Sequence, residues 1–312
     1  MKSAPIPVWI LTGYLGSGKT TLLSRWLRHH ALSGAALIIN EIGEIGFDDH
    51  VLAQSTDSAS VLLADQCVCC SGLPGLQEAL TELWWARLRR ERPRFDAVVI
   101  ETTGLADPRP LAQLFAFVPL LRERYALQGV VAAISATAGS DLLIGHEEVQ
   151  AQVKAANTIV VTKTDCAPGK AGTLAGHLRT LNPRAAILQS AHASISWPDI
   201  ATATAASAGI APPAKAFSLR KMGPIASGAA AHGMESVFHA CADPVSLDTW
   251  PAWLGPLLTP ELQRLKGVIR LDDQTLASVQ WSCGDTGPEF TPYVGAAPVL
   301  GLTVIRQAKV CL

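Results

Sequence analysis

The sequence lacks long hydrophobic runs, which limits the kinds of protein that it can encode. Its longest apolar stretches, such as residues 129–139, fall short of the roughly 18 residues that a membrane helix requires. The first apolar run, residues 8–11, is much shorter than the hydrophobic core of a signal peptide. We therefore expect no membrane span and no membrane partner, and we predict a cytoplasmic protein.

Charge of either sign is also scarce. The chain has 25 Lys and Arg residues against 26 Asp and Glu residues, so its formal net charge is −1 and no excess of positive charge attracts nucleic acid. Charged residues make up 16% of the sequence and hydrophobic residues 49%, a composition that excludes a disordered chain. Since a typical domain has about 150 residues, the 312 residues predict a globular protein of two domains.

The seven cysteines are too unevenly placed for a disulfide framework. Their number is odd, and Cys67, Cys69 and Cys70 crowd into one short segment. Disulfide-stabilised domains usually have an even number of cysteines that are spread over the chain. The cluster therefore indicates metal binding or thiol chemistry.

Short apolar segments alternate with helix-length segments over the first two thirds of the chain. Strands that are apolar on both faces are typical of a parallel sheet with helices on each side, so we predict an α/β fold with a doubly wound, mostly parallel sheet. The expected strands are residues 8–11, 36–39, 61–64, 97–100, 130–134 and 158–161. The expected helices lie near residues 19–30, 73–92, 109–124, 146–156 and 169–181.

A change of composition indicates where this domain ends. Residues 201–214 are mostly Ala, Thr, Ser and Pro and contain almost no side chains from which a core could be built, so we predict a linker there. The α/β domain then spans residues 1–200, and a smaller α+β domain spans residues 215–312. The second domain is expected to contain strands at 234–241, 267–271 and 275–282 and a helix near 245–265.

A phosphate-binding loop follows the first predicted strand. Residues 13–20 read Gly-Tyr-Leu-Gly-Ser-Gly-Lys-Thr, which matches the complete pattern G-x-x-x-x-G-K-[ST] between a strand and a helix. In such a P-loop, backbone N–H groups surround the α- and β-phosphates, Lys19 reaches the β- and γ-phosphates, and Thr20 binds Mg²⁺. The residues expected to bind nucleotide are Gly13, Gly16, Ser17, Gly18, Lys19, Thr20 and Thr21.

The residues after the strand at 158–161 indicate which base is bound. Thr162-Lys163-Thr164-Asp165 resembles the guanine-reading sequence Asn-Lys-x-Asp. The carboxylate of Asp165 can accept hydrogen bonds from the ring N–H and the amine of guanine, whereas adenine offers no such donor pair, so we predict GTP rather than ATP. Thr162 and Lys163 complete the expected base site. Because Thr162 replaces Asn, we expect one amide contact to the base or to the P-loop to be lost.

A carboxylate and a glycine follow the strand at 97–100. Glu101 can hold Mg²⁺ through water or orient the attacking water, and the backbone N–H of Gly104 can approach the γ-phosphate. The residues to which we assign catalytic roles are Lys19, Thr20, Glu101 and Gly104. Asp107 has a structural interpretation, as the N-cap of a helix that begins at Pro108.

The cysteine cluster lies where a strand is expected to give way to a helix. In an extended segment residues two apart share a face, so Cys67 and Cys69 can bind one ion, while Cys70 points away unless the backbone turns. A helix start at residues 73–75 favours the thiolate form that binds metal. Two alternatives remain open. Cys67 and Cys70 have the spacing of a redox pair, and the chain could be an interaction protein that a nucleotide switches without any metal.

The order of these segments resembles the CobW-type metal-chaperone GTPases, relatives of the nickel-insertion GTPases UreG and HypB. The resemblance covers most of the chain, including the P-loop, Asn40-Glu41, the cysteine cluster, residues 101–108 and the guanine-reading segment. It implies GTP-dependent delivery of a transition metal, often zinc, to a client metalloprotein. The cofactors implied are GTP, Mg²⁺ and Zn²⁺ or another divalent transition metal.

The resemblance also assigns metal ligands. Glu41, Cys67 and Cys69 match the family's ligand positions, and the fourth position of a tetrahedral site is left to Cys70, water or a ligand of the client. Gln66 stands where the family usually has Gly, and Ser135 stands where it usually has Asp.

Glu41 lies in the segment that is expected to order around the γ-phosphate, so we predict that metal affinity depends on the nucleotide state. The sequence shows no obvious arginine finger or water-positioning glutamine, which predicts slow hydrolysis of GTP. The sequence leaves open whether the chain forms a homodimer.

Overall fold

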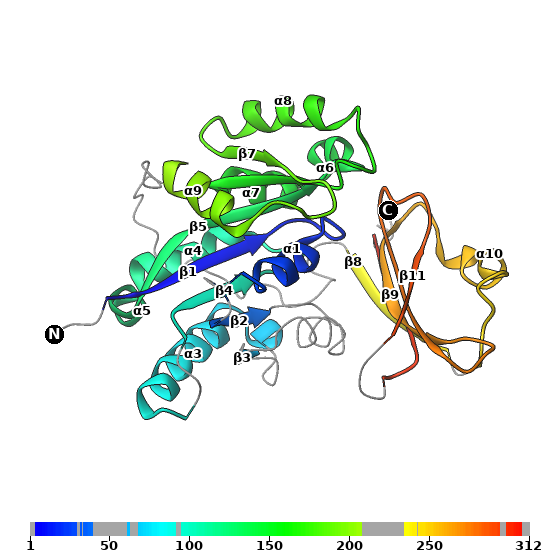
Figure 1. Ribbon diagram of the computed structural model, residues 1–312, viewed down its shortest axis with the longest axis horizontal. Helices are drawn as coiled ribbons and strands as arrows, with labels where there is room; N and C mark the ends of the chain where they lie inside the picture. The colour runs from blue at the N-terminus through cyan, green and yellow to red at the C-terminus, as the bar shows by residue number, and fades with distance from the viewer. Residues whose placement is uncertain are drawn as a thin grey trace, which may run out of the picture. The chain divides into compact units, whose positions relative to one another are not determined.

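The computed structural model describes residues 4–29, 32, 34–39, 61–62, 68–91, 95–207, 234–241, 243–293 and 298–307. These residues fall into two compact units. In the described part of the chain, the first unit extends to Ser207 and the second begins at Met234 (Figure 1).

The first unit is built on a seven-stranded parallel sheet. Its strands are β1 (Ile6–Thr12), β2 (Ala35–Ile39), β3 (Val61–Leu62), β4 (Ala97–Glu101), β5 (Tyr125–Ser135), β6 (Thr158–Thr162) and β7 (Ala186–Gln189). Their order in the sheet is β3-β2-β4-β1-β5-β6-β7, and all neighbouring strands pair in parallel. The predicted doubly wound α/β fold is therefore confirmed. In such a fold, ligands bind outside the carboxyl ends of the central strands.

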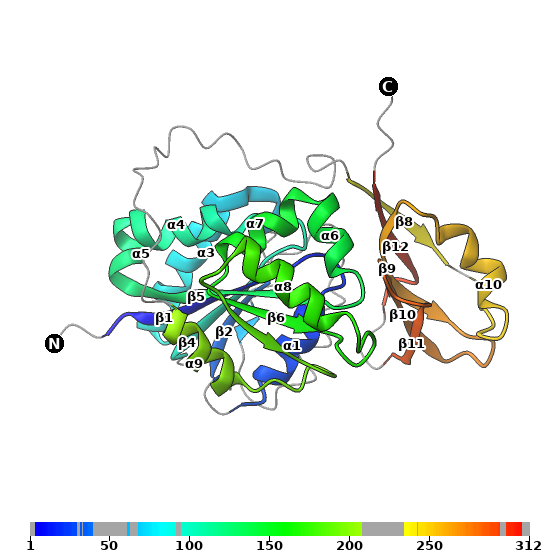
Figure 2. The same ribbon diagram turned by 90° about the horizontal axis from the view of Figure 1, so that it is seen from above.

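Helices cover both faces of this sheet (Figure 2). They are α1 (Lys19–Trp26), α3 (Val68–Arg89), α4 (Pro108–Phe117), α5 (Pro119–Arg124), α6 (Gly139–Gly145), α7 (Glu147–Ala155), α8 (Ala171–Leu181) and α9 (Trp197–Ser207). Because side chains alternate along a strand, Val8 and Ile10 of β1 pack with α3, α4 and α5, while Trp9 and Leu11 pack with α1 and α9. Helix α7 packs against α4 and β5.

The helix predicted at 109–124 is two helices. The break is at Val118, whose backbone is extended with φ −84° and ψ 111°. Proline disfavours the helical conformation of the residue before it, so Pro119 ends α4 at Phe117 and begins α5. Helix α6 was not predicted.

The linker predicted from residue 201 is wrong for residues 201–207, which form the second part of α9. Thr204 is buried, and its hydroxyl lies 2.7 Å from that of Thr158 on β6. A Cβ atom on Gly129 of β5 would collide with the methyl group of Thr204. The small side chains of this segment therefore allow the helix to lie close against the sheet.

The second unit is a five-stranded antiparallel sheet with the order β11-β10-β9-β12-β8. Its elements are β8 (Met234–Ala240), α10 (Trp250–Trp253), the 3₁₀ helix η3 (Gly255–Leu257), β9 (Leu262–Arg270), β10 (Leu276–Ser282), β11 (Glu289–Pro292) and β12 (Gly301–Gln307). The helix predicted at 245–265 is wrong, because only short helical segments form there and β9 begins at Leu262. Trp250 and Trp253 instead pack onto the core of this sheet.

No helix among the described residues has the length and apolar character that crossing a membrane requires.

Candidate functional site

Three glycines shape the loop after β1. Gly13, Gly16 and Gly18 have φ angles of 145°, 71° and 85°, which residues with a Cβ atom rarely adopt. A Cβ atom on Gly13 would also collide with the carbonyl oxygen of Ala133 on β5. The loop leads directly into α1, which begins at Lys19. Because the first N–H groups of a helix have no partner within it, the loop and the helix start form a cradle for an anion.

Lys19 and Thr20 lie beside the end of β4. The buried ammonium group of Lys19 donates to the carbonyl oxygens of Gly13 at 2.9 Å and Tyr14 at 3.3 Å. The hydroxyl of Thr20 donates to Oε1 of Glu101, the last residue of β4, at 3.1 Å. The structure thus brings together the lysine, the threonine and the carboxylate that the sequence pointed to.

Gly104 lies against the P-loop. A Cβ atom on Gly104 would be 2.5 Å from Cδ2 and 2.7 Å from the backbone nitrogen of Leu15. Just before it, the backbone N–H of Thr102 donates to the carbonyl oxygen of Leu11 at 2.9 Å, and its hydroxyl donates to that of Thr12 at 2.9 Å. The segment after β4 is therefore fixed beside the loop after β1, at a distance that only glycine permits.

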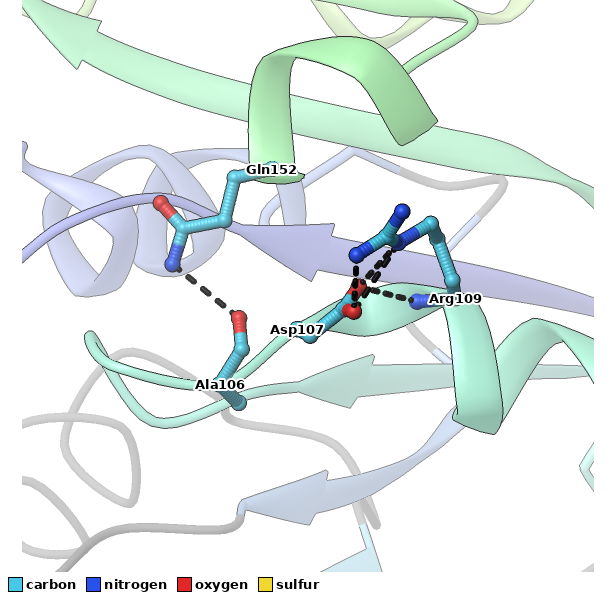
Figure 3. Close-up of polar contacts among 4 residues, drawn as sticks. All are labelled: Ala106, Asp107, Arg109 and Gln152. Atoms are coloured by element: carbon cyan, nitrogen blue, oxygen red, sulfur yellow. Dashed lines mark hydrogen bonds and ion pairs between the residues drawn. The ribbon is translucent and has the colours of Figure 1, made fainter. Parts of the chain in front are cut away.

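Asp107 caps α4, as its position before Pro108 predicted. Its carboxylate accepts a hydrogen bond from the backbone N–H of Arg109 at 2.9 Å. The Arg109 guanidinium pairs with the same carboxylate at 2.6 Å, and this pairing raises the pKa of Arg109 (Figure 3). The carboxylate of Asp107 therefore has a structural role at the helix start.

A glutamine on α7 holds the loop between β4 and α4, and the sequence did not single it out. Gln152 is fully buried, and its amide donates to the carbonyl oxygen of Gly104 at 3.1 Å. It also donates to the carbonyl oxygen of Ala106 at 3.2 Å (Figure 3). One signal was present: Gln152 follows Val149 by three residues and precedes Val153 by one, so it lies on the apolar face of its helix.

Thr162, at the end of β6, contacts the P-loop directly. Its hydroxyl is buried and donates to the carbonyl oxygen of Ser17 at 2.7 Å. The expected loss of a contact is therefore wrong for the P-loop, because the threonine hydroxyl makes a hydrogen bond to it.

Ser135 ends β5, the strand next to β6. Its hydroxyl oxygen lies 2.7 Å from that of Thr137 and accepts a hydrogen bond from the Thr137 backbone N–H at 3.3 Å. The hydroxyl of Ser135 is therefore hydrogen-bonded to an uncharged hydroxyl and to a backbone N–H.

The carboxylate of Asp165 is held by the neighbouring loop. The backbone N–H of His192 donates to Oδ1 at 2.9 Å, and Nδ1 of the same histidine lies 3.2 Å from Oδ2. The thiol of Cys166 donates to Oδ2 at 3.3 Å. The His192 N–H and the Cys166 thiol stabilise the charged form and lower the pKa of Asp165. The carboxylate is therefore ionised at neutral pH.

The loop after β7 approaches this segment through a left-handed backbone. His192 and Ala193 have φ angles of 49° and 54°, and Lys163 on the facing loop has a φ angle of 54°. The buried Ser190 donates from its N–H to the carbonyl oxygen of Val161 at 2.8 Å. The contact of His192 with Asp165 could not be found from the sequence, because it depends on two loops that are far apart along the chain.

The expected metal ligands lie only partly within the described residues. Glu41 and Cys67 fall outside them, and Cys69 and Cys70 belong to α3, which begins at Val68. The expected helix start at 73–75 is therefore wrong. Because Cys69 lies in a helix, the side-chain alternation of a strand, from which we expected Cys67 and Cys69 to share a face, does not apply to Cys69. In the part of the chain that the structure describes, no group of three or more His, Cys, Asp and Glu side chains is placed to hold a metal ion.

Comparison with known families gives a match to the nucleotide-binding domain of CobW, HypB and UreG over residues 7–189. The zinc chaperone YjiA from Escherichia coli strain K12 is 38% identical over 191 residues, which cover 61% of this chain and 59% of YjiA. Zinc-regulated GTPase metalloprotein activator 1 from Schizosaccharomyces pombe is 34% identical over 167 residues, which cover 52% of this chain and 39% of that protein. The chain therefore spans less than two thirds of the length of these curated relatives.

Solved structures give a similarity over nearly the whole chain. The zinc-bound YjiA GTPase from E. coli has 25% sequence identity and a TM-score of 0.50, with 97% of this chain and 94% of YjiA covered. A zinc-bound triple mutant of the YjiA GTPase has 26% identity and a TM-score of 0.52 over the same shares.

Proposed function

Because the chain belongs to the CobW/HypB/UreG family by its match over residues 7–189, we propose that it binds GTP, hydrolyses it to GDP and phosphate, and uses this cycle to deliver zinc to a client metalloprotein. The hydrogen bond of 2.7 Å from Thr162 to the carbonyl oxygen of Ser17 carries the nucleotide part of the proposal. It joins the guanine-reading segment to the P-loop, so that one nucleotide can reach both.

At the phosphate end, Lys19 is the residue that meets the β- and γ-phosphates. In this structure its ammonium group donates to the carbonyl oxygens of Gly13 and Tyr14. When a nucleotide binds, the ammonium group turns to the phosphate oxygens, which carry more negative charge. The N–H groups of residues 16–21 surround the phosphates at the start of α1.

The donors beside Lys19 fit Mg²⁺. Thr20 Oγ1 and Glu101 Oε1 are oxygen ligands that lie 3.1 Å apart, and Mg²⁺ prefers such hard oxygen donors. When bound, the ion would offset charge on the β- and γ-phosphate oxygens. Thr20 would hold the ion, Glu101 would hold it through water or orient the attacking water, and the N–H of Gly104 would donate to the γ-phosphate. Such sites hydrolyse GTP at about 10⁻⁴ to 10⁻² s⁻¹ without a partner, and we expect a rate in this slow range.

At the base end, Asp165 selects guanine. Its carboxylate is charged, and Oδ1 has a second lone pair beyond the one that the His192 N–H engages. Oδ2 lies near both the Cys166 thiol and the exposed His192 ring, and that ring can turn away to admit the base. Guanine can donate two hydrogen bonds to it, whereas adenine cannot. Lys163 and Thr162 complete the wall of the base site.

Zinc is the proposed cargo because two of the relatives bear zinc in their names and YjiA was solved with zinc bound. The proposed ligands are Glu41, Cys67 and Cys69, with the fourth position left to Cys70 or to a ligand of the client. Such an incomplete shell suits transfer, because the client can enter it before the ion leaves.

The test is a zinc titration of the full chain against a competing chelator, with GDP and with a non-hydrolysable GTP analogue. We expect tighter binding with the analogue by about 5- to 150-fold, the usual range for coupled sites. Glu41→Ala should remove that difference and Cys67→Ser should weaken binding in both states, while Cys283→Ser in the second unit should change neither.

Equal zinc affinities in the two nucleotide states would contradict the coupling. A disulfide between Cys67 and Cys70 in protein that binds no zinc would favour the redox pair instead. GTP binding without zinc or a disulfide would favour a nucleotide-switched interaction protein.

A further inference from the structure

We infer that Gln152 on α7 is a positioning residue for GTP hydrolysis, which holds the loop of Gly104 in the orientation that the γ-phosphate requires. This inference rests on the proposed function. It adds a residue from outside the P-loop, the guanine-reading segment and the segment after β4.

The two hydrogen bonds of the Gln152 amide hold two carbonyl groups of this loop. Its nitrogen donates to the carbonyl oxygen of Gly104 at 3.1 Å. It also donates to the carbonyl oxygen of Ala106 at 3.2 Å (Figure 3). In a trans peptide the C=O and the next N–H point to opposite sides, so the N–H groups of Leu105 and Asp107 are directed away from Gln152. The carbonyl oxygens, which would repel a phosphate, are thereby kept on the side of α7.

The third carbonyl of the loop is held within the loop itself. The oxygen of Thr103 accepts a hydrogen bond from the N–H of Ala106 at 3.2 Å. The N–H of Gly104 belongs to the same trans peptide group as the Thr103 carbonyl, so it points away from this hydrogen bond. The carbonyl oxygens of Thr103, Gly104 and Ala106 are therefore each held by a donor, and the last two depend on Gln152.

A packing role alone does not explain a glutamine at this position. Its Oε1 atom is buried without a hydrogen-bond partner among the described residues, which is unfavourable. Reversing the amide would place Oε1 against two carbonyl oxygens, so the observed orientation is the better one. A methionine would fill similar space without a buried unpaired oxygen, and the N–H donors are what the glutamine adds.

The helix that carries Gln152 is also tied to the P-loop. His146, directly before α7, has its Nδ1 atom 3.3 Å from the hydroxyl of Tyr14, and the two rings are 4.8 Å apart. Burial lowers the pKa of His146, so its neutral ring can accept from that hydroxyl. One helix therefore contacts both the P-loop and the Gly104 loop, and Gln152 sets the second relative to the first.

The experiment compares Gln152→Met with a matched control on the same helix, Gln150→Met. The amide of Gln150 donates to the carbonyl oxygen of Leu143 on α6 at 3.0 Å and does not contact the Gly104 loop. The full chain with Mg²⁺ is used to measure affinity for GDP, affinity for a non-hydrolysable GTP analogue, and kcat and KM for GTP.

We expect Gln152→Met to lower the affinity for the GTP analogue and kcat by about tenfold each, because two hydrogen bonds that hold the Gly104 loop are lost. The proposed contact of this loop is with the γ-phosphate, which GDP lacks. GDP affinity should stay within about twofold, the margin usual for sites without a direct contact. Gln150→Met should leave all three quantities near those of the wild type.

Equal losses for GDP and the analogue, or no loss of kcat, would overturn the inference, because Gln152 would then serve packing alone. If Gln152→Met does not fold, Gln152→Leu replaces it, since leucine also favours a helix and lacks the amide donors without adding a buried charge. Wild-type protein that neither binds nor hydrolyses GTP would overturn the proposed function itself, and the inference with it.

Discussion

The phosphate end and the base end of the proposed nucleotide site are built differently. Lys19 and Glu101 at the phosphate end are 5% and 1% exposed. At the base end, the side chains of Asp165 and His192 are 22% and 76% exposed. Charges interact more strongly where water is excluded, so the phosphate end should decide whether a nucleotide binds. The base end should decide which nucleotide is preferred.

The largest effect is expected from Lys19→Ala. Removing the buried cation that meets the phosphates should weaken GDP and GTP binding by more than about 100-fold, because hydrogen bonds between charged groups are the strongest in the site. Fluorescent-nucleotide titration measures both affinities. The control is Lys170→Ala, since Lys170 is exposed and its ammonium group donates to the carbonyl oxygen of Thr137 at 3.3 Å. Nucleotide affinity that survives Lys19→Ala would contradict the P-loop assignment.

Asp165→Asn should change the choice of base and leave the phosphate contacts intact. We expect GTP affinity to fall by about 10- to 100-fold and affinity for xanthosine triphosphate to rise, because the asparagine amide can donate to the C2 oxygen of xanthine. Competition titrations with GTP, xanthosine triphosphate and ATP measure this. Asp199→Asn on α9 is the surface control. ATP that competes as well as GTP for the wild type would refute guanine selection.

Thr162→Val tests the bond that joins the two ends. Valine has nearly the shape of threonine but cannot donate to the carbonyl oxygen of Ser17, which is 2.7 Å from the Thr162 hydroxyl. We expect GDP and GTP affinities to fall together by about three- to tenfold, the effect of one ordinary hydrogen bond. An effect on GTP alone would place Thr162 in contact with the γ-phosphate end, against the present assignment.

The smallest effect is expected from pH. The pKa of Asp165 is lowered from 3.8 by hydrogen bonds from the His192 N–H and the Cys166 thiol. A lowered carboxylate pKa stabilises the fold above the unfolded value, and this stabilisation is lost as the pH falls through the folded value. The difference in urea stability between wild type and Asp165→Asn should therefore stay constant from about pH 7 to about pH 5 and shrink only below about pH 4. A shrinking difference near pH 6 would contradict the lowered pKa.

Local patterns were sufficient for much of the first unit. The strands are apolar on both faces because helices cover both, and that pattern predicted six of the strands near their observed positions. The spacing of Gly13, Gly18 and Lys19 predicted the loop after β1, because a left-handed backbone before a helix start needs glycine. Asp107 before Pro108 predicted the start of α4 for a similarly local reason.

The second unit was predicted less well, for a physical reason. Residues 245–265 contain apolar side chains at helix-like spacing, but these pack onto an antiparallel sheet whose strands come from distant parts of the chain. Pairing with β12 and β10 makes a strand of residues 262–270. The alanines and threonines at 201–207 were likewise taken for a linker, although their small size is what lets α9 lie on β5 and β6.

The sequence by itself determined the α/β fold class, the loop after β1 and the residue types at both ends of the site, because each follows from side chains within a few positions of one another. Only the tertiary structure decided that Thr162 bonds to Ser17, that His192 holds Asp165 and that Gln152 holds the Gly104 loop. These contacts join segments 27 to 145 residues apart, and they exist because a parallel sheet brings the carboxyl ends of its strands to one edge.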